Sequence, residues 1–507
     1  MTVIEKPQAW PATLPHLVTE VPGPKALAQV AADQAVVSNS LPRAYPFAPV
    51  RGFGMGVEDQ DGNVFLDFCA GIAVNSTGHC HPRVVDAVVQ QAQRLLHYSA
   101  SDFYEQRYQE LASALAATAP WSGPSKVLLQ NSGTEAVEAS IKLARYMSGR
   151  QWIVGFVGGF HGRTLGALTL TNSKAKYHAH FGPLAPGFLH VPFGSHGLDE
   201  LEERIIARTI PGDEIAAFVV EPVQGEGGYV VPDEDFFPRL KQIADKYCIA
   251  IVVDEVQSGV GRTGKMWAIE NFGIEPDIIA TAKGLGSGMP IGAVIAKEHW
   301  MRWKPGSHGS TFGGNPVAAA AAIATLEVIR DEKLMENALA RGREAIDGLR
   351  AALMGNSIVT DIRGIGLMIG LWALLTMNST TFPTPAATWA EAVKLFSDPF
   401  YYNNPNDQGI GWNILNSLKR VGLGFGLAAL VGIPMGFIIG RFTFISNMLN
   451  PLISLLRPVS PLAWLPIGLL VFKSANPAAI WTIFICSIWP MIINTAVGVQ
   501  RVPEDYL

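Results

Sequence analysis

Two residues in the middle of the chain have the types and spacing needed for cofactor chemistry. Asp254 ends the apolar run IAIVVD, and Lys283 follows 29 residues later among the small residues of ATAKGLGSGMP. A lysine amine can form a Schiff base with an aldehyde, and a carboxylate can keep a pyridine nitrogen protonated so that the ring accepts electrons. The pair therefore suits pyridoxal phosphate. Taken singly, a carboxylate at a strand end is often a cap, and a loop lysine is usually only solvated.

A third feature, NSGTEAVEASIKLAR, could hold a phosphate group. Gly133 and Thr134 stand at the start of a stretch with helical spacing. The free N–H groups and the dipole at a helix N-terminus attract anions. A purely structural role, in which this stretch is an N-cap with Glu138 in the first turns, explains the same residues equally well when they are considered alone.

The elements around these residues predict how they are positioned. Segments with strand and helix patterns alternate over about 200 residues, from SKVLLQNSGTEAVEAS to PDIIATAKGLGSGMPIGAVIA. Such alternation predicts an α/β fold with a mostly parallel sheet and helices on both faces. Ligands of these sheets bind at the carboxyl ends of the strands, where the three motifs above all fall.

The composition divides the chain in two. From Ala373 onward, only 12 of 135 residues are Asp, Glu, Lys or Arg, against 69 in the first 372. The first part is typical of a soluble enzyme and the second is not. The net charge is −5 and there is no basic run, so we expect no nucleic-acid partner. The four cysteines (Cys69, Cys80, Cys248 and Cys486) are widely spaced, and we predict neither a disulfide nor a metal site.

Six motifs of the first part occur together in one known family. They are NSGTEAVE, GGFHGRT, EPVQGEGG, DEVQSGVGRTG, ATAKGLGSGMPIGAV and STFGGNP, in this order. Residues 20–371 thereby resemble the class III aminotransferases of the ornithine, acetylornithine and 4-aminobutyrate type, a branch of the fold-type-I pyridoxal phosphate enzymes. The resemblance implies transfer of an amino group from an ω-amino acid or ornithine-like donor to 2-oxoglutarate. Racemases and decarboxylases share these motifs and stay open.

The resemblance implies a role for each matching cofactor-site residue. Lys283 is similar to the family's Schiff-base and proton-shuttling lysine, and Asp254 to the partner of the pyridinium nitrogen. The remaining cofactor contacts it implies are Phe160 and Val256 on the two ring faces, Gln257 at the ring hydroxyl, Gly133 and Thr134 at the phosphate, and Thr311 at the phosphate of a neighbouring subunit. The last contact implies a homodimer.

Three further residues resemble substrate contacts. Arg163 is similar to a substrate-carboxylate contact of 4-aminobutyrate enzymes, and Glu221 to its ion partner. Glu226 is similar to a glutamate that pairs with an arginine beyond the segment GIGLMIGL, for which this chain has no counterpart. A buried, unpaired carboxylate is costly. We therefore expect weak binding of the cofactor and impaired transamination, with an incomplete small domain.

The second part has long uncharged runs. Residues 421–440 and 478–500 are each long enough to cross a bilayer, and 448–472 reads as a broken span that contains Arg457 and several prolines. Residues 373–507 resemble inner-membrane permease subunits of nitrate-, sulfonate- or taurine-type ABC importers. The coupling segment for the ATPase is not in the sequence, so we do not expect that partner to dock.

The two resemblances predict a domain order and a location. We expect an N-terminal arm (1–50), a C-terminally truncated aminotransferase domain (51–371), a polar linker (372–412) and an all-α transmembrane fragment (413–507), with the enzyme part in the cytoplasm at the inner membrane. Natural fusions join complete domains at linkers. Because both parts are cut inside a domain at GLWALL, we favour the hypothesis that the molecule is a chimera of two truncated genes. Two alternative hypotheses are an aminotransferase with a membrane tail and a permease subunit with a soluble N-terminal domain.

Overall fold

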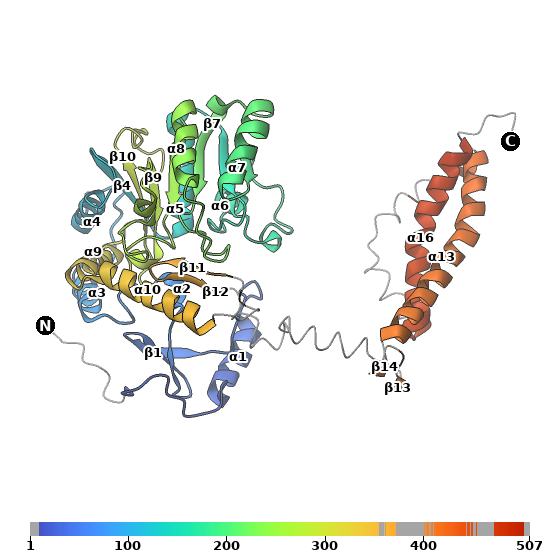
Figure 1. The fold of residues 1–507 in the computed structure, drawn as a ribbon, viewed down its shortest axis with the longest axis horizontal. Helices are drawn as coiled ribbons and strands as arrows, with labels where there is room; N and C mark the ends of the chain where they lie inside the picture. The colour runs from blue at the N-terminus through green and yellow to red at the C-terminus, as the bar shows by residue number, and fades with distance from the viewer. Residues whose placement is uncertain are drawn as a thin grey trace. The chain divides into compact units, whose positions relative to one another are not determined.

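The computed structural model describes residues 10–353, 359, 361–371, 400, 402–404, 407–408, 410–442, 444–446, 448–449, 453 and 471–500 (Figure 1). The chain forms two compact units, Met1–Leu375 and Thr376–Leu507. Most of the predicted span 448–472 and most of the predicted linker (372–412) lie outside the described residues.

A seven-stranded sheet is the centre of the first unit. Its strands, in spatial order, are β4 (Ser125–Gln130), β10 (Gly292–Lys297), β9 (Ile278–Thr281), β8 (Ala250–Asp254), β7 (Ile215–Val220), β5 (Trp152–Phe156) and β6 (Phe188–Val191). Neighbours from β9 to β6 are parallel, whereas β10 runs antiparallel to both β4 and β9. The predicted mostly parallel sheet is confirmed, and the reversed β10 is a feature that the apolar runs did not reveal.

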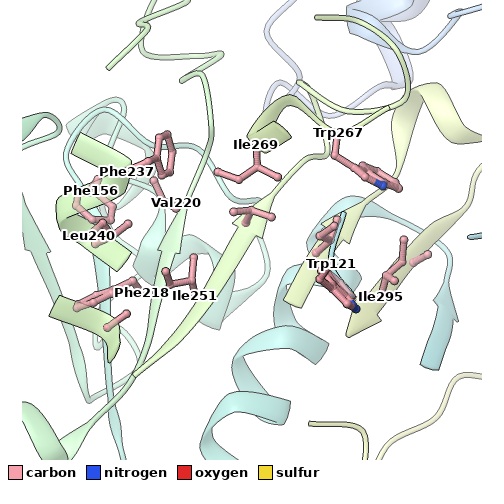
Figure 2. Packing of buried hydrophobic residues seen from close by; sticks show 14 of the residues in the cluster. Trp121, Phe156, Phe218, Val220, Phe237, Leu240, Ile251, Trp267, Ile269 and Ile295 are labelled. Atoms are coloured by element: carbon pink, nitrogen blue, oxygen red, sulfur yellow. The ribbon is translucent and has the colours of Figure 1, made fainter. Parts of the chain in front are cut away.

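Both faces of this sheet are buried, because successive side chains of β7 belong alternately to two different hydrophobic clusters. Phe218 and Val220 belong to one buried cluster, and Ala217 and Val219 belong to a second. The first cluster includes Phe236 and Phe237 of α8 (Phe236–Tyr247), as Figure 2 shows in part. The second includes the buried side of α5 (Gly133–Ser148). Strands buried on both faces read as continuous apolar runs, which is how these strands appear in the sequence.

Further helices and small sheets complete the first unit. The segment DQDG joins β2 (Gly56–Asp59) to β3 (Val64–Leu66) in a hairpin, with β1 (Pro49–Phe53) on the other side of β2. The other helices are α1 (Pro24–Val36), α2 (Ala70–Ala73), α3 (Pro82–Arg94), α4 (Gln106–Ala116), α6 (Leu165–Leu170), α7 (Ser195–Glu200), α9 (Pro316–Asp331) and α10 (Leu334–Leu353), with short turns η1 (Ala175–Tyr177), η2 (Leu201–Ile206), η3 (Gly212–Glu214), η4 (Ala268–Phe272) and η5 (Lys283–Leu285). The hairpin of β11 (Ile362–Ile365) and β12 (Met368–Leu371) packs near α10. The helix α1 lies within residues 1–50, which were predicted as an N-terminal arm.

The second unit contains two long helices packed along their lengths. They are α13 (Ile410–Arg441) and α16 (Ala475–Gln500), preceded by the short pair β13 (Tyr402–Asn404) and β14 (Asp407–Gln408). Within them, Ser417–Arg441 and Asn476–Val499 are long and apolar enough to cross a membrane. Among the described residues, 28% and 22% of the most apolar 18-residue window of each stretch is buried.

Candidate active site

A cavity of about 490 Å³ lies at the carboxyl ends of the parallel strands. Its wall is made by the segments that follow β4, β5, β7, β8 and β9, together with the segment that leads into β10. Nine of the predicted site residues line it: Gly133, Thr134, Phe160, Arg163, Glu221, Asp254, Val256, Gln257 and Lys283. The fold therefore brings together residues that are as much as 150 positions apart.

Asp254 is held by two hydrogen bonds at the end of β8. Its Oδ2 accepts from Nδ1 of His161 at 2.7 Å, and its Oδ1 accepts from the Val256 backbone N–H at 3.0 Å. Burial lowers the pKa of His161, but the hydrogen bond and charge of Asp254, with the charge of Glu221, outweigh burial and raise the pKa. The site therefore holds a buried carboxylate in a fixed orientation, ready to bind a protonated ring nitrogen.

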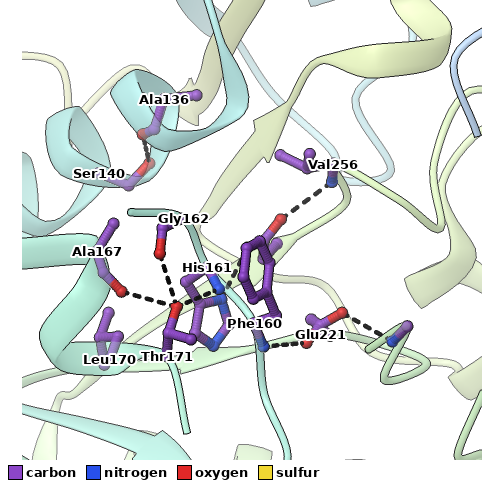
Figure 3. A network of polar contacts seen from close by, with 12 residues as sticks. Ala136, Ser140, Phe160, His161, Gly162, Ala167, Leu170, Thr171, Glu221 and Val256 are labelled. Carbon is purple, nitrogen blue, oxygen red and sulfur yellow. Dashed lines mark hydrogen bonds and ion pairs between the residues drawn. The ribbon is translucent and has the colours of Figure 1, made fainter. Parts of the chain in front are cut away.

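His161 was not singled out from the sequence. It lies in GGFHGRT directly after Phe160, in the loop that follows β5. Its backbone N–H donates to the Thr171 hydroxyl, whose oxygen lies 3.0 Å from the carbonyl oxygen of Gly162 in the loop and 3.1 Å from that of Ala167 in α6 (Figure 3). A histidine inside a motif that already supplied two candidate residues was the available signal.

Glu221 differs from its predicted role as the ion partner of Arg163. Its carboxylate accepts instead from the backbone N–H groups of Phe160 at 2.8 Å and Gly225 at 2.9 Å (Figure 3). Burial raises the pKa of Glu221 to about 7, with the Asp254 charge adding to the rise and the His161 charge opposing it. Backbone donors satisfy this carboxylate, so Glu221 braces the loop that carries Phe160.

Arg163 contacts aromatic rings rather than an acid. Its guanidinium carbon lies 4.2 Å from the centroid of Tyr177 and 5.7 Å from that of Phe160. Within the described residues, no carboxylate oxygen lies within 4.0 Å of its guanidinium nitrogens. Stacking on rings leaves the N–H edges of the guanidinium available for a carboxylate.

Glu226 is neither buried nor unpaired, contrary to the prediction. Its Oε2 lies 3.2 Å from Nζ of Lys174, and the Tyr177 hydroxyl is 3.5 Å away. Its side chain is 35% exposed, so water also solvates it. The expected cost of an unpaired buried carboxylate does not arise, because a lysine 52 positions earlier in the sequence supplies the opposite charge.

Lys283 begins η5, two residues after the end of β9, and lines the cavity. Burial lowers the pKa of its amine, while the charges of Asp254, Glu221 and Glu226 act in the opposite direction. A lowered pKa increases the fraction of the amine that is neutral and therefore nucleophilic at a given pH. Perturbed titration of several groups around one cavity is typical of a functional site.

The phosphate end of the cavity is formed by the N-terminus of α5. Ser132 caps the helix, and its hydroxyl accepts from the Glu135 N–H at 3.4 Å. Gly133 lies so close to Val256 that a Cβ at this position would be 2.7 Å from Cγ1 of the valine. The lack of a side chain keeps the helix N–H groups open to the cavity, which fits an anion at this place.

The residues therefore fit pyridoxal phosphate, with donors for a phosphate at one end, a buried acid at the other, and Phe160 and Val256 between them. Thr311 is the exception. It does not line this cavity but a separate hollow of about 460 Å³ with Ser101, Tyr108 and His308. Its predicted contact with a neighbouring subunit stays a prediction.

Comparison with known proteins decides the family. A profile described as aminotransferase class-III matches residues 38–386. The chain belongs to this family. The acetylornithine aminotransferase of Methanothermobacter thermautotrophicus is 47% identical over 327 residues, covering 64% of this chain and 80% of that protein. The alanine/serine racemase of Pyrococcus horikoshii is 38% identical, covering 70% and 79%. The crystal structure of ornithine aminotransferase from Toxoplasma gondii has a TM-score of 0.62 at 34% identity, covering 67% and 80%.

This class-III aminotransferase is a pyridoxal phosphate-dependent transaminase. The cofactor, when bound, supplies an aldehyde for amines and a ring that accepts electrons. Asp254 accepts a hydrogen bond from His161, and in this position its carboxylate would hold a proton on the ring nitrogen of the cofactor. The amine of Lys283 lines the same cavity, and the predicted proton transfer by this amine at the reacting carbon stays a prediction. Phe160 and Val256 both line the cavity, and their predicted places on the two faces of the ring stay a prediction.

Proposed function

We propose that this aminotransferase moves the amino group of an acetylornithine- or ornithine-like donor, or another ω-amino acid, to 2-oxoglutarate. The observation that carries the proposal is that Lys283, the hydrogen-bonded Asp254–His161 pair and the N-terminus of α5 all line the same cavity. The relatives named acetylornithine and ornithine aminotransferase support the choice of donor. The site roles predicted for Gly133, Thr134, Val256 and Gln257, and the homodimer through Thr311, are part of this proposal.

The test is transamination by the purified full chain, loaded with pyridoxal phosphate in a mild detergent. N-acetylornithine, ornithine, 4-aminobutyrate and lysine are offered as donors, and glutamate formed from 2-oxoglutarate is measured. Glutamate formed with one of these donors supports the proposal. A chain that binds the cofactor but inverts alanine or serine without any amino transfer would contradict it and favour a racemase, as in the relative from Pyrococcus horikoshii.

The same assay decides whether transamination is impaired. The prediction of weak cofactor binding rested on the missing arginine partner of Glu226, whose place Lys174 takes. A turnover number of about 1–1,000 per second, the ordinary range for enzymes, would refute impaired transamination. Tight binding of the cofactor would refute the predicted weak binding.

We further propose that α13 and α16 insert into a lipid bilayer as a packed pair of helices. Four glycines of α13 face α16, where a Cβ would come within about 3 Å of its side chains or backbone: Gly424, Gly432, Gly436 and Gly440. Small residues at such an interface are typical of membrane helices, because they let backbones approach closely. The outward side chains include exposed Leu423, Phe425, Leu430 and Phe437. Lys419 and Arg420 precede the uncharged run and Arg441 follows it.

Extraction of cell membranes with alkaline carbonate tests this proposal on the full chain. Retention in the membrane pellet supports insertion, and release into the supernatant contradicts it. Transport is a second candidate for this part, resting on the resemblance to ABC importer permeases, and it requires an ATPase that copurifies with the chain. Single-molecule sequencing of the source DNA across codons 360–385 tests the chimera: two separate genes there would confirm it, and one continuous frame would exclude an assembly error.

A further inference from the structure

The two long helices of the second unit run in the same direction. The four interface glycines of α13 meet residues of α16 in ascending order, in the pairs Gly424–Ile483, Gly432–Met491, Gly436–Thr495 and Gly440–Val499. In each pair the α16 residue follows its glycine by the same number of positions. In an antiparallel pair, one residue number would fall as the other rose. The start of α13 therefore lies beside the start of α16, and the two ends lie side by side (Figure 1).

This parallel contact is long enough to extend through most of a membrane. From Gly424 to Gly440 the helix rises about 24 Å, at about 1.5 Å per residue, and the hydrocarbon core of a bilayer is about 30 Å thick. Two neighbouring helices that cross a bilayer in the same direction cannot be joined on one side of it. The chain between them, residues 442–474, has to lead from the side on which α13 ends to the side on which α16 starts.

The described residues of this connection lie against the helix pair at both of its ends. After α13, Ile453 is only 7% exposed and belongs to the same buried cluster as Ile439 and Ile492. Before α16, the ring of Phe472 lies 6.2 Å from that of Trp481. The chain thus turns back toward the helix pair after α13 and meets it again at the start of α16. A return through the bilayer needs about 20 residues in a helix, and residues 442–474 exceed that length.

We propose that the chain before α13 and the chain after α16 lie on opposite sides of the bilayer, because the chain crosses once in each helix and once between them. The inference rests on the proposed insertion of α13 and α16. The aminotransferase unit precedes α13 in the sequence. We assign this unit and the starts of both helices to the cytoplasmic side, and the ends of both helices to the opposite side.

The basic residues near the helix ends favour this orientation. Three of them flank the starts of the two helices and two flank the ends, namely Lys419, Arg420 and Lys473 against Arg441 and Arg501. Arg457 lies inside the connection and belongs to neither group. Segments on the cytoplasmic side of membrane helices carry the excess of Lys and Arg, whereas acidic residues contribute little to orientation.

Cysteine labelling with a membrane-impermeant maleimide tests this topology on the full chain in intact spheroplasts. Phe442→Cys places a thiol directly after α13, and Ser474→Cys places one directly before α16. Both residues are exposed, and neither change alters a charge. We expect labelling of Phe442→Cys before lysis, and labelling of Ser474→Cys only after lysis. The wild-type chain is the matched control, because its exposed Cys69, Cys80 and Cys248 belong to the first unit and should stay unlabelled until lysis.

Equal labelling of the two variants before lysis, whether complete or absent, would overturn the inference, because both ends of the connection would then lie on one side. Labelling of the wild-type chain before lysis would overturn the assignment of the enzyme to the cytoplasmic side. Extraction with alkaline carbonate separates this failure from that of the proposed insertion. A chain that stays in the membrane pellet but labels equally in both variants refutes the topology alone. A chain that carbonate releases refutes the insertion itself.

Discussion

Nδ1 of His161 donates a hydrogen bond to Oδ2 of Asp254 at 2.7 Å, between two side chains that are only 1% and 3% exposed. The two residues come from different strand ends of the sheet and are 93 positions apart. A buried acid that is hydrogen-bonded on both oxygens cannot turn away from the cavity. This pair fixes the direction in which the site presents its negative charge.

Loss of that charge should cost most of the activity. In Asp254→Asn the carboxamide cannot hold a proton on the ring nitrogen, and we expect kcat to fall at least about 100-fold. His161→Asn keeps the acid but loosens it, so we expect a fall of about tenfold and a shifted pH profile of kcat. The exposed His196→Asn serves as the control. Equal kcat in wild type and Asp254→Asn would exclude the assigned role.

Lys283→Ala should abolish both the activity and the cofactor's visible absorption band, because it removes the amine that bonds to the aldehyde. The measurement is the absorption spectrum and the glutamate assay on the purified chain. Lys304→Ala, at an exposed position outside the cavity, should retain both. Persistence of both signals in Lys283→Ala would refute the assignment of this lysine.

Gly133→Ala should weaken cofactor binding. The added Cβ would lie 2.7 Å from Cγ1 of Val256, so either the helix start or the valine must move out of place. We expect the dissociation constant of pyridoxal phosphate to rise about tenfold, as a loss of about 1.4 kcal/mol. Gly348→Ala is the matched control, since a Cβ there meets nothing within 4 Å on α10. The proposed phosphate site fails if the two variants bind the cofactor equally.

Stability of the first unit should fall as the pH rises toward neutral, partly through Glu255. Burial raises the pKa of Glu255 from 4.5 to about 7, against hydrogen bonds from Ser258 and the Ile269 N–H that act to lower it. A carboxyl with a raised pKa stabilises the fold fully below its unfolded pKa, and this stability is lost as the pH rises through the folded pKa. The contribution is about 3 kcal/mol at most between about pH 4.5 and about pH 7.

Glu255→Gln should remove this part of the pH dependence, because the amide does not ionise. Urea unfolding followed by the fluorescence of buried Trp267 at about pH 5 and about pH 8 measures it. Relative to wild type, the variant should gain stability at the higher pH. The exposed Glu234→Gln should follow wild type. Parallel curves for wild type and Glu255→Gln would contradict the prediction.

The packing of α13 on α16 can be tested through its glycines. At Gly436 a Cβ would lie 2.6 Å from Cβ of Thr495, whereas at Gly426 it would meet nothing within 4 Å. Gly436→Leu should therefore separate α13 from α16, and Gly426→Leu should not. A disulfide engineered between the helices of the membrane-embedded chain should form less efficiently only in Gly436→Leu. Equal cross-linking in both would show that the glycine face does not pack as described.

The sequence by itself determined the class of the fold and the core of the site. Apolar runs alternating with helical segments predicted the sheet, and Asp254, Lys283 and Gly133 were recognisable because parallel strands bring their carboxyl ends to one edge. The long uncharged runs 421–440 and 478–500 were equally visible, and they lie within α13 and α16.

Only the tertiary structure decided which residues of the site form hydrogen bonds and ion pairs with one another. The hydrogen bond of His161 to Asp254 joins residues 93 positions apart, and the ion pair of Lys174 with Glu226 joins residues 52 positions apart. Glu221 is bound by a main-chain donor, the Phe160 N–H. No periodicity in the sequence encodes such contacts. The direction of β10 and the choice of Gly436 rather than Gly426 as an interface glycine were likewise hidden. Both depend on which surface the folded neighbours present, and that is settled only when distant segments pack together.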